Sequence, residues 1–265
     1  MNRTIAHHMI AAEILKLRRH RATMVTALML SVGITVLYFA AIEFRHGGGL
    51  GGAQVLSDGS SLLGIYFGSF TSILIGTEAG TTDLANGVFR DLVATGRSRI
   101  ALFLVRLPAA VAVALAFNFS GFVVTVAAVI AFRSPASPAS LSLILQSAGW
   151  VALATAVVTS LAVGVASLTG SRSLTLTAVI AWQTIASMLL FTARFLGSAR
   201  DAVLLIALGH LRPGIAYGTY IHPGSSNALP GYELPMSTGV ALLVILAWAV
   251  FPAVAGAWRT AARDA

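Results

Sequence analysis

Long apolar runs alternate with short polar segments along this chain. Six runs contain no Asp, Glu, Lys or Arg and are long enough, at about 17–25 residues, to cross the ~30 Å hydrocarbon core of a bilayer as helices. The runs are continuous and do not alternate with period two, which argues against a membrane barrel. The pattern predicts six spanning helices, at about residues 22–42, 59–77, 107–132, 141–170, 173–193 and 234–258.

The composition also indicates a helical membrane protein. The 265 residues are 57% hydrophobic and 10% charged, whereas soluble domains are about 45–50% apolar and ~25% charged. We expect a single all-α polytopic membrane domain over residues 1–265. The net charge is +8, but the basic residues lie at the edges of apolar runs and do not cluster with aromatic residues. The sequence therefore predicts no nucleic-acid partner.

The distribution of Lys and Arg sets the expected orientation. With the N-terminus inside, the cytoplasmic segments hold twelve of these residues and the external segments five. Both termini are therefore predicted to be cytoplasmic. One external segment contains an apolar stretch, Ala202–Leu211, that is too short to span the membrane and is expected to be a re-entrant or interfacial helix.

Several kinds of chemistry lack their usual residues. The six predicted spans carry no charged side chain, which argues against a gradient-driven carrier, although broken helices can bind sodium through backbone carbonyls. The only lysine, Lys16, is not in a G-x-x-x-x-G-K-[ST] phosphate-binding motif. No paired carboxylates face each other within a span, and the histidines lie outside the spans. We therefore predict no catalytic, metal or cofactor site in this chain, and keep a gradient-driven carrier and a lipid-modifying enzyme as alternatives.

The connection between the second and third predicted spans is unusually long, from Glu78 to Arg106. Within "DLANGVFRDLVATG", either Asp83 or Asn86 can cap a short helix, and Gly96 can end it. A short amphipathic helix at a membrane surface is suited to a groove of a soluble protein. The other interpretation is a solvated loop.

Residues 4–21 predict a helix that lies on the membrane surface. Ala6, Ile10, Ile14 and Leu17 form a narrow apolar stripe. On the same helix Glu13 and Lys16 are three residues apart, a spacing that allows an ion pair.

The second predicted span has a small residue at every fourth position. A bare face of this kind allows close helix packing, either inside the subunit, which we favour, or against a partner subunit. Phe67 and Phe70 lie off that face and are candidates to line a conduit, as are Gln183 and Met188 of the fifth span, with simple packing as the alternative. Asn118 is expected to form an interhelical hydrogen bond. The small residues are Ser60, Gly64, Gly68, Ser72 and Gly76.

The stretch "NGVFRDLVATGRSR" resembles the cytoplasmic loop of permease subunits of type-2 ABC exporters, of the bacterial drug, bacitracin and lantibiotic-immunity kind. Asp83 stands where the family commonly has Glu, and Val88 where it commonly has Thr. Two other stretches fit: "AEILKLRRHR" is similar to the family's N-terminal connecting helix, and "WRTAARDA" to its short C-terminal tail.

The resemblance implies that Gly87–Arg99 forms a coupling helix docked on a separate ATPase. Two ATPase copies would bind ATP and Mg, and a second permease subunit, identical or paralogous, would complete the transporter. The complex would export an amphipathic or hydrophobic compound, such as a drug, antibiotic, peptide or lipid, across the bacterial cell membrane. The implied coupling residues are Asp83, Asn86, Gly87, Arg90, Asp91, Leu92, Gly96 and Arg99, and the candidates for ATPase or membrane-surface contact are Glu13, Lys16 and Arg18.

Overall fold

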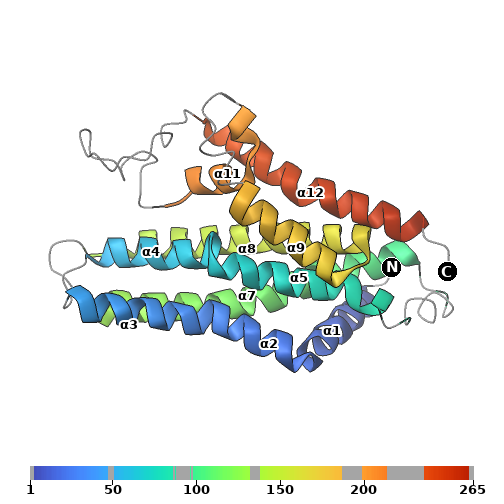
Figure 1. The fold of residues 1–265 in the computed structure, drawn as a ribbon, viewed down its shortest axis with the longest axis horizontal. Helices are drawn as coiled ribbons and strands as arrows, with labels where there is room; N and C mark the ends of the chain where they lie inside the picture. Colours follow the sequence, from blue (N-terminus) through green and yellow to red (C-terminus); the bar gives the residue numbers. More distant parts are fainter. Residues whose placement is uncertain are drawn as a thin grey trace.

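The computed structural model describes residues 3–46, 51–85, 87, 96, 98–131, 138–186, 199–213 and 236–262, and in these residues the ordered elements are all helices. Most of the helices run along one bundle axis, and α12 crosses them obliquely (Figure 1). In chain order they are α1 (Arg3–Arg19), α2 (Arg21–Leu28), the π-helix η1 (Met29–Gly33), α3 (Ile34–His46), α4 (Gly52–Gly64), α5 (Phe67–Ala85), α7 (Arg99–Ala131), α8 (Leu141–Thr169), α9 (Arg172–Ala181), the π-helix η2 (Trp182–Ala186), α11 (Leu204–His210) and α12 (Thr238–Ala262).

Five helical stretches are long and apolar enough to cross a membrane: Arg21–Phe44, Gly52–Leu84, Arg99–Ala131, Leu141–Thr169 and Thr238–Ala262. They correspond to the first, second, third, fourth and sixth predicted spans. The fifth predicted span, 173–193, is helical from Arg172 to Ala186, and the rest of it lies outside the described residues. The all-helical membrane class is thus supported.

The second predicted span, 59–77, is longer and less regular than expected. It consists of α4 and α5, which are separated by a break at Ile65 and Tyr66. The helix also continues past Glu78 and Asp83, where the loss of hydropathy suggested that it would end. Asp83 therefore lies inside α5, so of the two alternative caps, Asp83 and Asn86, Asp83 is excluded, and Asn86 lies outside the described residues.

The helix of the third predicted span also extends beyond the apolar run. This helix, α7, begins at Arg99 and carries Arg106 within it, whereas the apolar run begins at Leu107. The candidate spanning helices are consequently longer than the apolar runs and include charged side chains, among them Asp58, Glu78, Asp83 and Arg106. The predicted runs themselves are free of charge, but the helices extend beyond them.

Helix α8 lies at the centre of the core and packs against α4, α5, α7 and α12. The larger of two buried apolar clusters is centred on it and includes Val151, Val158 and Leu161. At its crossing with α12, a Cβ on Gly256 would lie 2.8 Å from the carbonyl oxygen of Gly164. Glycines at both positions therefore permit close backbone contact between the two helices.

The short helix α11, within the predicted re-entrant segment, is packed into the bundle. Leu204, Ile206 and Leu208 are each at most 1% exposed. The indole N–H of Trp150 on α8 donates to the carbonyl oxygen of Leu208 at 2.8 Å. This segment is thus part of the core at its end of the bundle.

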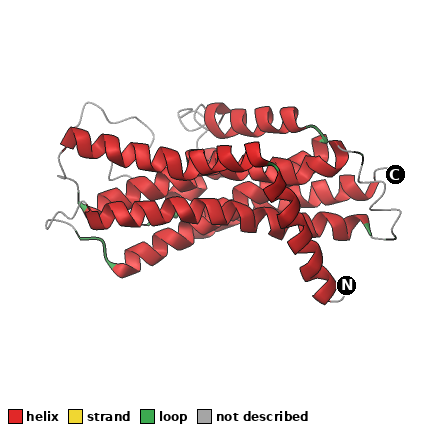
Figure 2. Ribbon diagram, turned by 90° about the horizontal axis from the view of Figure 1, so that it is seen from below, coloured by secondary structure: helices red, strands yellow, loops and turns green. Residues whose placement is uncertain are grey.

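Helix α1 leaves the bundle at an angle (Figure 2) and lies at the same end of the molecule as the last residues of α12 (Figure 1). We call this end the α1 end. Its apolar stripe faces the bundle, with Leu17 fully buried and Ile14 packed beside it. The expected position on the membrane surface stays a prediction. The predicted pair of Glu13 and Lys16 is also present, at 2.6 Å.

Candidate functional site

Seven ionisable side chains from four helices and one helix junction meet at the α1 end of the bundle, although they are distant in the sequence. They come from α1, the α1–α2 junction, α5, α7 and the start of α9. We call this cluster the ionic layer; it comprises Glu13, Lys16, His20, Glu78, Asp83, Arg106 and Arg172.

Asp83 is the centre of the first half of the ionic layer. One carboxylate oxygen accepts from an Arg106 Nη at 2.6 Å, and the other accepts from Lys16 Nζ at 2.8 Å. The side chains of Asp83 and Arg106 are 3% and 1% exposed, so their charges compensate each other out of contact with solvent. Because Lys16 lies on α1 and Arg106 on α7, the Asp83 carboxylate of α5 joins three helices. Lys16 also pairs with Glu13 of its own helix.

Glu78, which lies on α5 like Asp83, is the centre of the second half of the ionic layer. Its side chain is 5% exposed and lies 3.1 Å from an Arg172 Nη and 3.2 Å from His20 Nδ1. The hydroxyls of Thr82 and Thr23 donate to it at 3.2 Å and 3.4 Å. Arg172 in turn donates to Thr23 at 3.4 Å, so this half joins α5, α2 and α9.

The ion pairs of the ionic layer hold neighbouring helices together. Both buried carboxylates lie beside cationic side chains, which compensate their negative charge away from solvent. Removing one partner from such a cluster leaves a buried charge uncompensated, which is strongly unfavourable. The part of the chain that the structure describes holds no group of three or more His, Asp or Glu arranged to bind a metal ion.

The ionic layer closes the base of the segment that joins α5 to α7. Asp83 lies at the end of α5, Arg106 lies two turns into α7, and their ion pair holds the two stems together. Both helices that lead into this segment are therefore fixed to each other and, through Lys16, to α1.

The segment itself contains most of the implied coupling residues, and Asn86, Arg90, Asp91 and Leu92 lie outside the described residues. Gly87 and Gly96 have positive φ angles of 70° and 81°. This left-handed conformation is readily adopted by glycine, and it is the usual one just after a helix. Arg99 begins α7 and donates to the carbonyl oxygen of Ala261 on α12 at 3.3 Å.

The small residues of the second span do not form one continuous face, because the helix is broken between α4 and α5. Gly64 and Gly76 lie against α8: a Cβ on Gly64 would clash with the ring of Trp150, and one on Gly76 would lie 2.7 Å from Ala162 Cβ. A Cβ on Gly68 would instead clash with the carbonyl group of Leu63, at the break in its own helix pair.

The other small residues, Ser60 and Ser72, are buried and donate to backbone carbonyls one turn earlier. Asn118 on α7 provides the expected interhelical hydrogen bonds. Its amide donates to Thr155 Oγ1 on α8 at 2.9 Å and to the carbonyl oxygen of Gly68 at 3.1 Å. This fully buried amide therefore ties α5, α7 and α8 together.

The candidate conduit residues are found in separate places. Phe67 and Phe70 are half-buried and make an edge-to-face contact with ring centroids 6.1 Å apart. Gln183 is buried on η2, and Met188 lies outside the described residues. The contact between the two phenylalanines accounts for their position by packing.

Sequence reasoning assigned no role to four members of the ionic layer: His20, Glu78, Arg106 and Arg172. The available signal was an ionisable residue directly beside an apolar run, which is costly in a membrane unless it is paired. The partner of each such residue could not be identified from the spacing of the sequence, because paired residues such as Lys16 and Asp83 are 67 positions apart. The same limit applies to Thr23 and Arg172, which are 149 positions apart.

Comparison with known proteins gives no further identification: no family model matches this chain, and neither do the curated proteins or the solved structures.

Proposed function

We propose that this chain is the transmembrane permease subunit of an ATP-driven exporter, of the type-2 ABC kind that its loop sequence resembles. In this proposal it lies in a bacterial cell membrane with both termini in the cytoplasm. Two copies of a separate ATPase bind ATP and Mg, and a second permease subunit completes the conduit. The cargo is an amphipathic or hydrophobic compound.

One observation carries the proposal: the Asp83–Arg106 ion pair joins the two stems of the segment that would contact the ATPase. A force on that segment reaches α5 and α7 together, because their ends are cross-linked. Lys16 extends the connection to α1. Both α5 and α7 pack on α8. A movement of the segment between α5 and α7 would therefore be transmitted to α8, in the middle of the bundle.

The positive-inside pattern supports the orientation, since the α1 end carries the basic residues of α1, namely Lys16, Arg18 and Arg19. An ATPase on that side of the membrane would meet the coupling segment and α1 at the same end. The chain has no lysine-containing phosphate-binding motif, so the energy of ATP would come from the partner.

A gradient-driven carrier is the second candidate, and the buried carboxylates Glu78 and Asp83 are the observation that favours it. Carriers place acidic side chains in their spanning helices to bind a proton or cation. Each of these two carboxylates, however, already has an Arg within 3.1 Å. A transported cation would have to displace those arginines from the carboxylates, so we rank this candidate lower.

A liposome assay separates the two candidates. The chain alone, and the chain with its co-purified ATPase, are reconstituted and supplied with either ATP or a proton gradient. We expect ATP-dependent transport by the complex and none by the chain alone. Transport by the lone chain that depends on the gradient and collapses with an ionophore would overturn the proposal.

A further inference from the structure

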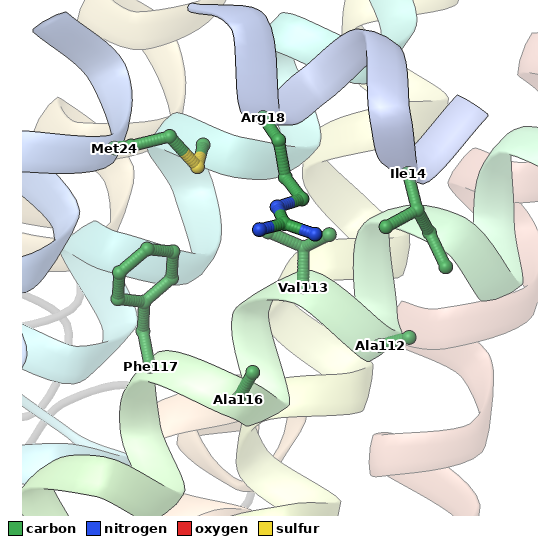
Figure 3. Close-up of a pocket in the computed structure, with 7 residues that line it drawn as sticks. All are labelled: Ile14, Arg18, Met24, Ala112, Val113, Ala116 and Phe117. Carbon is green, nitrogen blue, oxygen red and sulfur yellow. The ribbon is translucent and has the colours of Figure 1, made fainter. Parts of the chain in front are cut away.

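A groove of about 490 Å³ lies in the angle between α1, α2 and α7. Its walls are Ile14 and Arg18 of α1 and Met24 of α2, and four residues of α7 form its floor. Figure 3 shows the Arg18 side chain directed from α1 toward α7, into this groove, with Phe117 and Met24 to one side. The groove is therefore apolar except for one guanidinium.

Arg18 differs from the other cation of the same turn. Lys16 is half-buried and bound to two carboxylates of the ionic layer. Arg18 is exposed, and among the described residues no carboxylate pairs with it. An arginine beside apolar surface at a membrane boundary is stabilised by a phosphate group, which its planar fork can bind bidentately.

The groove opens onto surface that suits acyl chains. Beside Met24, the side chains of Val25 and Leu28 on α2 are 56% and 42% exposed. Helices α2 and α7 both belong to stretches that are apolar enough to span a membrane. On α7 the groove floor includes the exposed small residues Ala112 and Ala116, which leave room along the helix. A ligand here would have an apolar chain along α7 and an anionic group at α1.

We propose that this groove binds an anionic phospholipid of the surrounding bilayer, with its phosphate on Arg18 and one acyl chain along Ala112, Ala116 and Phe117. The site lies beside the ionic layer, because Arg18 is two residues from Lys16 on α1. A bound lipid fills the angle between α1 and α7 and holds α1 against the bundle. This inference does not depend on the energy source of transport.

Native mass spectrometry of the full chain in detergent tests the charge. The chain is incubated with equal amounts of phosphatidylglycerol and phosphatidylcholine, and retained lipid is counted. One basic residue near an anionic membrane surface favours binding about fivefold. We expect that preference in the natural chain, its loss in Arg18→Gln and its retention in Arg18→Lys. Arg19→Gln is the matched control, since Arg19 is also exposed on the last turn of α1 but does not line the groove.

A second pair of variants tests the shape. Ala112→Phe fills the groove and should reduce retention of both lipids, whereas Val123→Phe, on an exposed part of α7 away from the groove, should not. Both positions are exposed, so the variants are expected to fold, and their thermal unfolding is measured alongside.

Three results would overturn the proposal. Equal retention of the two lipids by the natural chain would remove the anionic preference. Equal losses in Arg18→Gln and Arg19→Gln would show only diffuse attraction by the basic end of α1. A shift from dimer to monomer in Ala112→Phe, with lipid retention unchanged, would show that a second copy of the chain covers the groove.

Discussion

Removal of the Asp83 carboxylate is the most direct test of the ionic layer. In Asp83→Leu, the Arg106 guanidinium loses the carboxylate that lies 2.6 Å away, at a site where the Arg106 side chain is 1% exposed. Taking one partner from a buried ion pair costs about 3–5 kcal/mol. In Arg106→Met, Asp83 keeps Lys16 at 2.8 Å, so we expect a smaller loss, of about 2 kcal/mol.

The double variant isolates the coupling between the two residues. In Asp83→Leu/Arg106→Met both charges are replaced by apolar side chains, a change that is often neutral for a buried pair. Lys16 still has Glu13 at 2.6 Å and is 27% exposed, so it is not left buried without a counter-charge. We therefore expect the double variant to be more stable than Asp83→Leu by at least about 2 kcal/mol.

Thermal unfolding in one detergent measures these differences. For a chain of this size, 1 kcal/mol shifts the midpoint by about 2–4 °C, so Asp83→Leu should lower it by at least about 6 °C. Glu43→Gln, at an exposed position on α3, is a charge-removing control that should shift it little. If the double variant melts as low as the sum of the single losses predicts, Asp83 and Arg106 do not act as a pair and the reasoning is refuted.

Three further predictions use other parts of the chain. Gly76→Ala should destabilise the bundle by about 1–3 kcal/mol because its Cβ meets α8 at 2.7 Å, whereas Gly149→Ala, with open space around it, should be neutral or stabilising in the same melting assay. Trp150→Phe loses the 2.8 Å hydrogen bond to Leu208 and should cost about 1–3 kcal/mol by denaturant titration, and a cost no larger than that of an exposed Trp would refute the role of this bond. If the chain binds an ATPase as proposed, Leu92→Asp should abolish its co-purification without affecting membrane insertion; unchanged co-purification would exclude this segment as the docking element.

The sequence predicted the fourth span most accurately because its limits are set by local groups. The expected range was 141–170, and α8 runs from Leu141 to Thr169. At its start Ser140 Oγ accepts from the N–H of Leu143 at 3.2 Å, and at its end Gly170 has a φ of 67°. Serine before a helix and glycine after it are readable without knowledge of the fold.

The second span was predicted least accurately because its limits depend on distant residues. Glu78 and Asp83 reduce the hydropathy of the end of α5, yet the helix continues because cations from α1, α7 and α9 pair with them. The hydropathy of a sequence window includes the charges of Glu78 and Asp83 but not the distant cations that pair with them. For the same reason the sequence predicted only a polar connection between the second and third spans. It did not predict the ionic layer that joins the two helices at the ends of this connection.

The two ends of the bundle are held together by different interactions. Away from the α1 end, large side chains such as Trp150, Phe122 and Leu161 belong to one continuous apolar cluster. The smaller apolar cluster, which includes Leu17 and Phe103, is rich in alanine, with Ala27, Ala79, Ala110 and Ala114. Alanine buries little area, so apolar burial contributes less there, and the packing of α1, α5 and α7 depends on each buried charge keeping its partner. Ion pairs are directional and can exchange partners in discrete steps, which suits an end that moves between two arrangements, whereas a close-packed apolar core resists gradual deformation. In an exporter driven from the α1 end, the Asp83–Arg106 pair would keep the stems of α5 and α7 together, while α1 could exchange its Lys16 contact and the core around α8 moves as a unit.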